Sequence, residues 1–288
     1  MPRDLLGSAM RIVEYLSRSR EPVGVRELSR HLGVAAASAH RVLQSLKREG
    51  LVVQFGEQGM YSTGHRLVEL STNLMQTNHL VPIASPFLIN AATQSGESAV
   101  LMVIDGHETV CVASVESEQM LRVVFPLGCR GPLYHGASGS ILLAFQGPEF
   151  LEQVVAAGRR ENAGLTQQGA YALLRDLPQV RKTGVAVSYG ERLEGWTSVA
   201  AAVHAPGGNV IGSVALYGPS ARFLKDKLGK NFKYAVACAD AITVALGRKM
   251  NADGIGPRSA TDPIVGRQHR MAITRASTSA KTTPARLQ

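Results

Sequence analysis

Apolar residues in the segment 35–49 recur with the period of an α-helix. Positions i, i+3, i+4 and i+7 share one helical face, and apolar side chains occupy all four: Ala39, Val42, Leu43 and Leu46. The opposite face is mostly polar: Ala37, Arg41, Gln44 and Arg48, with His40 and Ser45 at its edges. Such a helix packs on its apolar side and offers the other to a polar partner. The major groove of DNA is our candidate partner.

Two shorter helical patterns precede this segment, and a hairpin pattern follows it. The first runs over 8–19, with Ser8 as its expected N-cap, and the second over 26–32, ended by Gly33. In 51–63, two β-type runs flank a glycine-bounded turn. Three helices and a hairpin predict a winged helix-turn-helix. The alternative is a three-helix bundle without a nucleic-acid role, because amphipathic helices with an Arg-bearing outer face are common.

Another helical pattern, over 65–78, carries a narrow leucine stripe made of Leu67, Leu70 and Leu74. This stripe could pack on its own domain or seal a dimer. We place a domain boundary near residue 79. The expected divisions are a DNA-binding domain, a linker and dimerisation helix, an effector-binding domain and a basic disordered tail: 1–63, 64–79, 80–250 and 251–288.

Strand and helix patterns alternate between residues 80 and 250. Strands are predicted at 97–105, 109–116, 121–126, 185–189, 197–205 and 210–218. Helices are predicted within 139–158, within 171–184 and over 221–249. Turn residues join neighbouring strands, so this region is an α+β domain, an antiparallel sheet with helices packed on it.

The charge distribution supports a two-part chain. The net charge is +9. Residues 1–50 hold nine Lys/Arg against five Asp/Glu, residues 248–288 hold eight against two, and the region between them is close to neutral. A chain with basic ends and a nearly neutral middle fits a nucleic-acid-binding domain joined to a domain with a different function.

Several classes of protein are disfavoured by the sequence. The chain has no stretch long enough for a membrane span and no signal peptide, so we expect a cytoplasmic protein. Three scattered cysteines fit neither a disulfide framework nor a zinc site. The segment 135–140, HGASGS, fails the G-x-S-x-G nucleophile pattern, and no HExxH or P-loop occurs. We therefore expect no catalytic residue, metal or cofactor.

Six segments in order resemble the IclR-type transcriptional regulators over about residues 7–250. They are ELSRHLGVAAASAHRVLQSLKREGLV, the run from Tyr61 to Leu70, VIDGHETVCVASVES, PLGCRGPLYHGASGSILLAF, RKTGVAVSYGERLEGWTSVAAAV and GSVALYGPSARF. The resemblance implies an N-terminal winged helix-turn-helix, a linker helix and a C-terminal profilin/GAF-like α/β effector-binding domain. It also implies a homodimer or tetramer on double-stranded DNA.

On the DNA side, we expect Arg41 and Gln44 to read base edges. The side chains suited to phosphate, or to added positive charge, are Arg26, Ser38, Ser45 and Arg48. His40 could serve either purpose, and Ala37 shares the face. Relatives often have Pro-Lys-Ser-Thr where this chain has residues 35–38, AAAS, and the expected wing tip holds Glu57 but no Lys or Arg. We therefore expect few DNA anchors.

On the effector side, the resemblance implies that backbone amides of Gly136 and Ala137 point at a ligand carboxylate. It places the remaining pocket positions at Leu101, Val103, Ser188, Trp196, Ser198, Ala215 and Tyr217. Relatives that bind small oxoacids tend to have Asp, Cys and two Ser at four of these positions. A pocket that lacks those groups and has Trp196 and Tyr217 favours a larger, flatter or more apolar ligand, such as an aromatic or other medium-sized organic acid. The alternative is that both rings serve ordinary core packing.

Taken together, these patterns predict a ligand-responsive repressor of a catabolic or transport operon, with a small organic acid as effector. Two alternatives remain at this stage. One is a GAF-like sensor that acts through protein partners, and the other is a hydrolase.

Overall fold

The computed structural model describes residues 5–56, 59–77, 79–160, 165–191, 194–223 and 225–252. The chain divides into two compact units, residues 1–78 and 79–288, and each is described by itself. The expected tail lies outside the described residues from position 253 onward, as does Glu57 of the wing.

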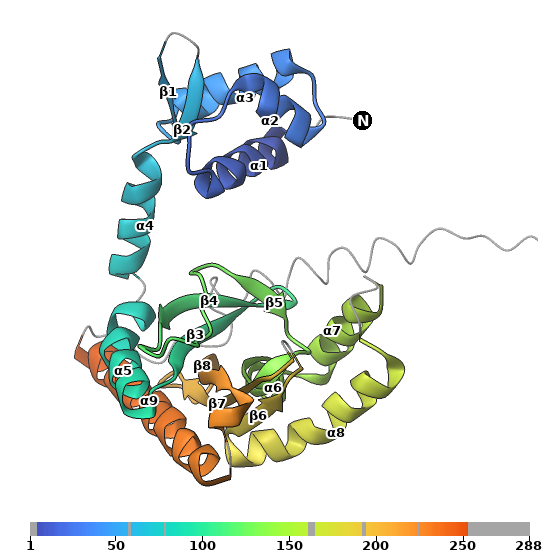
Figure 1. Cartoon of the computed structure of the whole chain (residues 1–288), viewed down its shortest axis with the longest axis vertical. Coiled ribbons are helices and arrows are strands. Elements are labelled where there is room, and N and C mark those ends of the chain that lie inside the picture. Colours follow the sequence, from blue (N-terminus) through green and yellow to red (C-terminus); the bar gives the residue numbers. More distant parts are fainter. Residues whose placement is uncertain are drawn as a thin grey trace, which may run out of the picture. The chain divides into compact units, whose positions relative to one another are not determined.

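The first unit is a winged helix-turn-helix, as predicted (Figure 1). Its elements are α1 Leu5–Arg18, α2 Val25–Leu32, α3 Ala36–Arg48, β1 Val52–Phe55, β2 Met60–Thr63 and α4 Arg66–Thr77. The apolar faces of α1, α2 and α3 meet the hairpin in one core. Gly33 ends α2 in the left-handed conformation, with φ 64°. Val23 also pairs with Tyr61 of β2 through two backbone hydrogen bonds of 2.8 Å, which fastens the hairpin to the helices.

The prediction that Ser8 caps the first helix is wrong. The helix α1 begins at Leu5, so Ser8 lies inside its first turn. Leu5 and Leu6 are strong helix formers, and residues 5–7 contain no proline, so the helix includes them.

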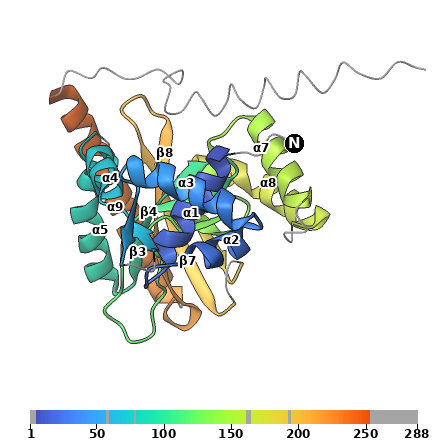
Figure 2. The ribbon, with the colours of Figure 1, turned by 90° about the horizontal axis from the view of Figure 1, so that it is seen from above.

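The second unit is a six-stranded antiparallel sheet in the order β5-β4-β3-β8-β7-β6. Its strands are β3 Ser98–Asp105, β4 Glu108–Val115, β5 Arg130–Pro132, β6 Val185–Tyr189, β7 Trp196–His204 and β8 Val210–Pro219. The helices α5 Leu80–Ser95 and α9 Lys225–Ala252 lie side by side on one face (Figure 2). The helices α6 Gly136–Ala144, α7 Pro148–Arg160 and α8 Gln167–Thr183 belong to the other. The α+β prediction is confirmed.

Alternation along each strand divides the core into two clusters. On β8, Val214 and Leu216 pack in the cluster with α5 and α9, whereas Ala215 and Tyr217 pack in the cluster with α6. Successive side chains of a strand point to opposite faces, so alternate residues of β8 pack in different clusters. We call the second side the α6 face of the sheet.

The predicted strand at 121–126 is not a strand. Both edges of β3 are occupied, by β4 and β8, and the outer edge of β4 pairs with Arg130–Pro132 instead. The apolar run therefore has no neighbouring strand to pair with, and Pro126 lacks the backbone N–H that strand pairing requires. The segment instead forms a wall of the cavity described below. The expected helix over 221–249 is also shifted, because a 3-10 turn at Ser220–Arg222 precedes α9.

Candidate DNA interface and effector cavity

The outer face of α3 carries the residues predicted to meet DNA. Ala39, Val42, Leu43 and Leu46 are buried in the core of the first unit. The predicted contact residues on the other side are exposed or half-buried: Ala37, Ser38, His40, Arg41, Gln44, Ser45 and Arg48. Arg26 is exposed on α2. The helix-turn-helix thus brings the predicted contact residues of α3 to one open surface.

These polar side chains differ in how firmly they are held. Gln44 donates its amide N–H to the hydroxyl of Tyr61 at 3.3 Å, and its Nε2 lies 3.2 Å from Nε2 of His40. Arg48 donates to the hydroxyl of Ser45 at 3.3 Å. Among the residues that the structure describes, the guanidinium of Arg41 has no hydrogen-bond partner. Arg41 is therefore the side chain on this face most able to reach a base edge.

Sequence reasoning missed two contacts that brace this surface. Lys47 donates from Nζ to the side-chain oxygen of Gln54 on β1 at 2.8 Å, which ties α3 to the hairpin. Tyr15 on α1 donates to the carboxylate of Glu27 on α2 at 2.7 Å, and this hydrogen bond raises the pKa of Tyr15. Each pair joins residues of different elements, so no local pattern indicates it.

The helix α4 presents apolar side chains at its surface. Leu70 is 52% exposed and Val68 is 62% exposed. Leu67 is half-buried, and the side chain of Leu74 lies outside the described part of the helix.

A cavity of about 320 Å³ opens on the α6 face of the sheet. Its walls come from the segment 123–129, the loop after β6, and the neighbouring ends of β6, β7 and β8. The lining residues are Val123, Val124, Phe125, Pro126, Cys129, Ser188, Gly190, Glu191, Trp196, Thr197, Ser198 and Tyr217. Four residues predicted for the effector pocket, Ser188, Trp196, Ser198 and Tyr217, are among them.

A row of hydroxyls crosses the floor of this cavity. Ser188, Ser198 and Tyr217 are successive partners across β6, β7 and β8. Ser188 is 4% exposed and Ser198 is 3% exposed, and neither hydroxyl has a hydrogen-bond partner among the described residues. The ring of Phe125 lies 4.4 Å from that of Tyr217, centroid to centroid. The cavity thus combines buried hydroxyls with aromatic surface, which can hold a flat ligand that carries polar groups.

The first backbone amide of α6 contacts a residue of the cavity wall. Gly136 has φ 84°, a conformation that favours glycine, and its N–H donates to the carboxylate of Glu191 at 2.9 Å. The following Ala137 is fully buried in the core, as is Ala215 on β8. A Cβ on Gly139 would lie 2.1 Å from the carbonyl oxygen of Leu133, so the turn leading into α6 passes very close to the helix.

Two expected pocket residues lie elsewhere. Leu101 packs in the cluster with α5 and α9, on the opposite side of the sheet from the cavity. Val103 is two positions further along β3, and both side chains approach the Cβ position of Gly212. Because alternate residues of a strand share a face, neither residue can form a wall of this cavity.

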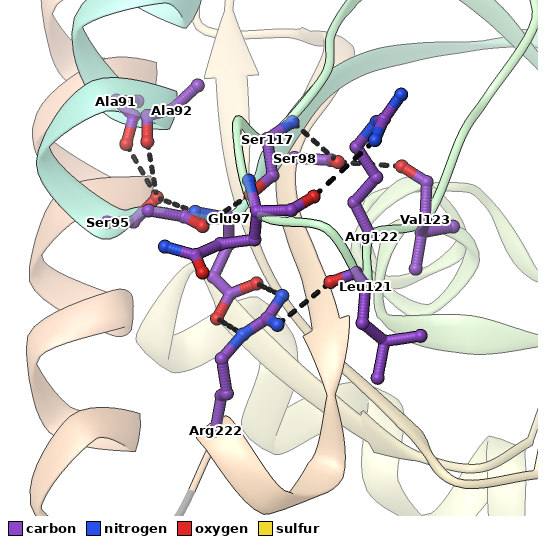
Figure 3. Close-up of polar contacts among 12 residues, drawn as sticks. Ala91, Ala92, Ser95, Glu97, Ser98, Ser117, Leu121, Arg122, Val123 and Arg222 are labelled. Carbon is purple, nitrogen blue, oxygen red and sulfur yellow. Dashed lines mark hydrogen bonds and ion pairs between the residues drawn. The ribbon is translucent and has the colours of Figure 1, made fainter.

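An ion pair between Arg222 and the buried carboxylate of Glu97 anchors the wall segment 121–126 (Figure 3). Arg222 donates to both carboxylate oxygens of Glu97, at 2.7 and 2.6 Å, and to the carbonyl of Leu121 at 2.8 Å. Ser98 donates to the carbonyl of Val123 at 2.7 Å and accepts from the N–H of Ser117 at 3.0 Å. Hydrogen bonding to Glu97 raises the pKa of Arg222. These contacts take the place of the strand pairing that the segment lacks.

Among the described residues, no group of His, Cys, Asp and Glu is arranged to hold a metal ion. None of the described helices has both the length and the hydropathy needed to cross a membrane.

Comparison with known proteins was consistent over both units. The family described as "Bacterial transcriptional regulator IclR C-terminal" matches residues 72–244, and the "IclR helix-turn-helix domain" matches residues 6–55. The HTH-type transcriptional repressor AllR of Escherichia coli K12 is 26% identical over 239 residues, which is 83% of this chain and 88% of that protein.

Solved structures share the fold. The IclR protein of Thermotoga maritima superposes with a TM-score of 0.67 at 25% identity, over 84% of this chain and 98% of that one. An IclR homologue from Microbacterium hydrocarbonoxydans, solved in complex with 4-hydroxybenzoate, gives a TM-score of 0.71 at 22% identity, over 84% and 99%. Since the C-terminal family alone spans more than half of the sequence, the chain belongs to the IclR family of bacterial transcriptional regulators.

Proposed function

We propose that this regulator is a cytoplasmic repressor that binds operator DNA as a homodimer or tetramer and responds to an aromatic organic acid. The observation that carries the DNA-binding half is the outer face of α3, where Arg41 has no partner among the described residues. A catabolic or transport operon is the expected target. AllR, a repressor similar over most of this chain, supports the repressor assignment.

At the DNA, Arg41 would read guanine with its two-pronged guanidinium, and Gln44 would read adenine. Ser38, Ser45, Arg48 and Arg26 would contact phosphates, which set the register of the protein on the duplex without specifying sequence. His40 suits either type of contact. The apolar residues Leu67, Leu70 and Leu74 of α4 would join two copies, and the exposure of Leu70 supports this use.

At the effector, the rings of Phe125, Trp196 and Tyr217 would sandwich a flat ligand, and the serine hydroxyls would bind its polar groups. The cavity of about 320 Å³ lies at the small end of ligand pockets, which run from roughly 300 to 1,000 Å³. It suits a single-ring compound better than a large one. The 4-hydroxybenzoate complex of the Microbacterium homologue supports such a ligand, because that protein has the same fold.

The DNA-binding half can be tested with sites selected from random duplexes by the full-length protein. Arg41→Ala should weaken binding to a selected site by about 10- to 100-fold, the range expected when a bidentate hydrogen-bond pair to one base is removed. Arg159→Ala, which removes an exposed arginine of α7, serves as the matched control and should bind like the parent. Equal affinity of all three proteins would contradict the role of Arg41. Failure to select any site would favour a sensor that acts through protein partners.

The effector half can be followed through Trp196, the only tryptophan of the chain. Titration with 4-hydroxybenzoate should change its fluorescence and should reduce affinity for the selected DNA site. Unchanged fluorescence with this and related aromatic acids would contradict an aromatic effector.

A further inference from the structure

The charge inside the effector cavity is unexpected for a site that receives an anion. Among the described residues that line it, Glu191 supplies a carboxylate and no Lys, Arg or His is present. A carboxylate ligand that entered beside the Glu191 carboxylate would meet a group of like charge at close range, which raises the free energy of the bound ligand in a partly desolvated site. Glu191 therefore bears directly on which ligands bind.

The carboxylate of Glu191 occupies the donor that an effector carboxylate would use. It accepts the N–H of Gly136 at 2.9 Å, at the N-terminus of the nine-residue helix α6. This end of a helix favours negative charge, because its N–H groups are unpaired and its dipole is positive there. A single N–H cannot serve two carboxylates at full strength, so Glu191 and a ligand carboxylate would compete for it.

Two further groups mark where the ligand would lie. Ser188 and Ser198 are more than nine-tenths buried as residues, line the cavity, and have no hydrogen-bond partner for their hydroxyls among the described residues. The space that these hydroxyls can reach is the cavity, so a polar group of a ligand bound there would supply the missing partner. Both residues belong to the strands that the Glu191 loop connects.

The Glu191 side chain is placed to leave this position. It is exposed, so moving the carboxylate into water restores its hydration and breaks one described hydrogen bond.

We propose that Glu191 is an internal competitor that gates the effector site. A carboxylate ligand takes the Gly136 N–H only when Glu191 gives it up, so ligand binding is coupled to a displacement of the Glu191 side chain. The proposal rests on the proposed function in one respect, that the effector is a carboxylate. Glu191 then sets the ligand concentration at which the protein responds, and it acts on carboxylates but not on neutral analogues of the same shape.

The test compares the full-length parent with Glu191→Ala and Glu191→Gln. Glu194→Gln is the matched control, because Glu194 is an exposed glutamate of the same loop. Affinity for 4-hydroxybenzoate and for its neutral analogue 4-hydroxybenzamide is measured by calorimetry, which does not depend on the environment of Trp196. We expect Glu191→Ala to bind 4-hydroxybenzoate about tenfold more tightly than the parent. Glu191→Gln should fall between them, because a neutral amide oxygen accepts a weaker hydrogen bond than a carboxylate.

Affinity for 4-hydroxybenzamide should change much less in both variants, and Glu194→Gln should behave like the parent with both probes. Equal or weaker binding of 4-hydroxybenzoate by both Glu191 variants would overturn the gate while leaving the aromatic-acid effector in place. Complete loss of binding in these variants alone would also overturn the gate, and it would identify Glu191 as a direct ligand contact. Absence of binding in every protein would overturn the effector assignment and the gate together.

Discussion

Arg41 and Gln44 both lie on the outer face of α3, yet their surroundings differ. The amide of Gln44 is tethered to Tyr61, a buried residue of the wing strand β2, and to His40 one turn away. These contacts restrain Gln44, so it would lose less conformational entropy in the proposed contact with a base. Arg41 has no such support among the described residues, and in its proposed contact specificity would come from the rigid shape of the guanidinium.

Replacing Tyr61 by Phe tests this positioning. The ring stays in the core while the hydroxyl that accepts from Gln44 is removed, so the free energy of unfolding should fall by only about 1 kcal/mol. Affinity for the selected DNA site should fall about three- to tenfold, and affinity for unrelated DNA should not change. In a Gln44→Ala background, Tyr61→Phe should have no further effect on specific binding. An equal effect in both backgrounds would show that Tyr61 does not act through Gln44.

At the scale of elements, the wall segment 121–126 shows how a non-repetitive stretch is held in place. It lacks strand partners, and its backbone is anchored at Leu121 and Val123 by side chains of Arg222 and Ser98. Arg222 in turn depends on the nearly buried carboxylate of Glu97, whose side chain is 4% exposed. One buried pair therefore links the start of β3, the turn before α9 and the cavity wall.

Arg222→Met should destabilise the protein by about 3–5 kcal/mol, because it leaves the buried Glu97 carboxylate without its partner. Adding Glu97→Gln should recover part of that loss. Arg122→Met is the control, since Arg122 pairs with Glu116 at the surface, where ion pairs contribute about 0–1 kcal/mol. Urea unfolding measures all three variants. A loss in Arg222→Met no larger than in Arg122→Met would show that the pair does not anchor the wall.

At the scale of the whole molecule, charge and chemistry are divided between different parts of the chain. The DNA-binding unit is basic, the region holding the effector cavity is close to neutral, and the last residues are again basic. The wing tip, as far as its sequence shows, contributes no Lys or Arg. We therefore propose the basic C-terminal residues as a source of phosphate contacts in addition to those proposed for α3 and Arg26.

Deleting residues 253–288 should reduce the salt dependence of DNA binding. The logarithm of affinity falls with the logarithm of salt concentration by about 0.9 for each phosphate that the protein neutralises, so the slope should decrease by about that amount for every phosphate the tail binds. Affinity for 4-hydroxybenzoate should not change, because the described cavity is lined by residues between positions 123 and 217. Gel-shift titrations at several salt concentrations provide the slopes, and equal slopes would contradict a DNA-contacting tail.

Local patterns were sufficient for the winged helix-turn-helix and for most of the sheet. The helical period in α3, the positive φ of Gly33 and the turn residues of the hairpins depend on neighbours within a few positions, so they can be read along the chain. Resemblance to the family then indicated several cavity residues by position. The sequence prediction was wrong at Ser8 and in the apolar run 121–126, where the local pattern was compatible with two different structures.

Only the tertiary structure decided which of these residues meet. Leu101 lies on the side of the sheet opposite the cavity, because side chains alternate between the two faces along β3 and Leu101 points toward α5 and α9. The contacts of Glu191 with Gly136 and of Arg222 with Glu97 join residues 55 and 125 positions apart. Whether such residues touch depends on strand order and register across the whole sheet, which are settled by the packing of all elements together and leave no signal in a local stretch of sequence.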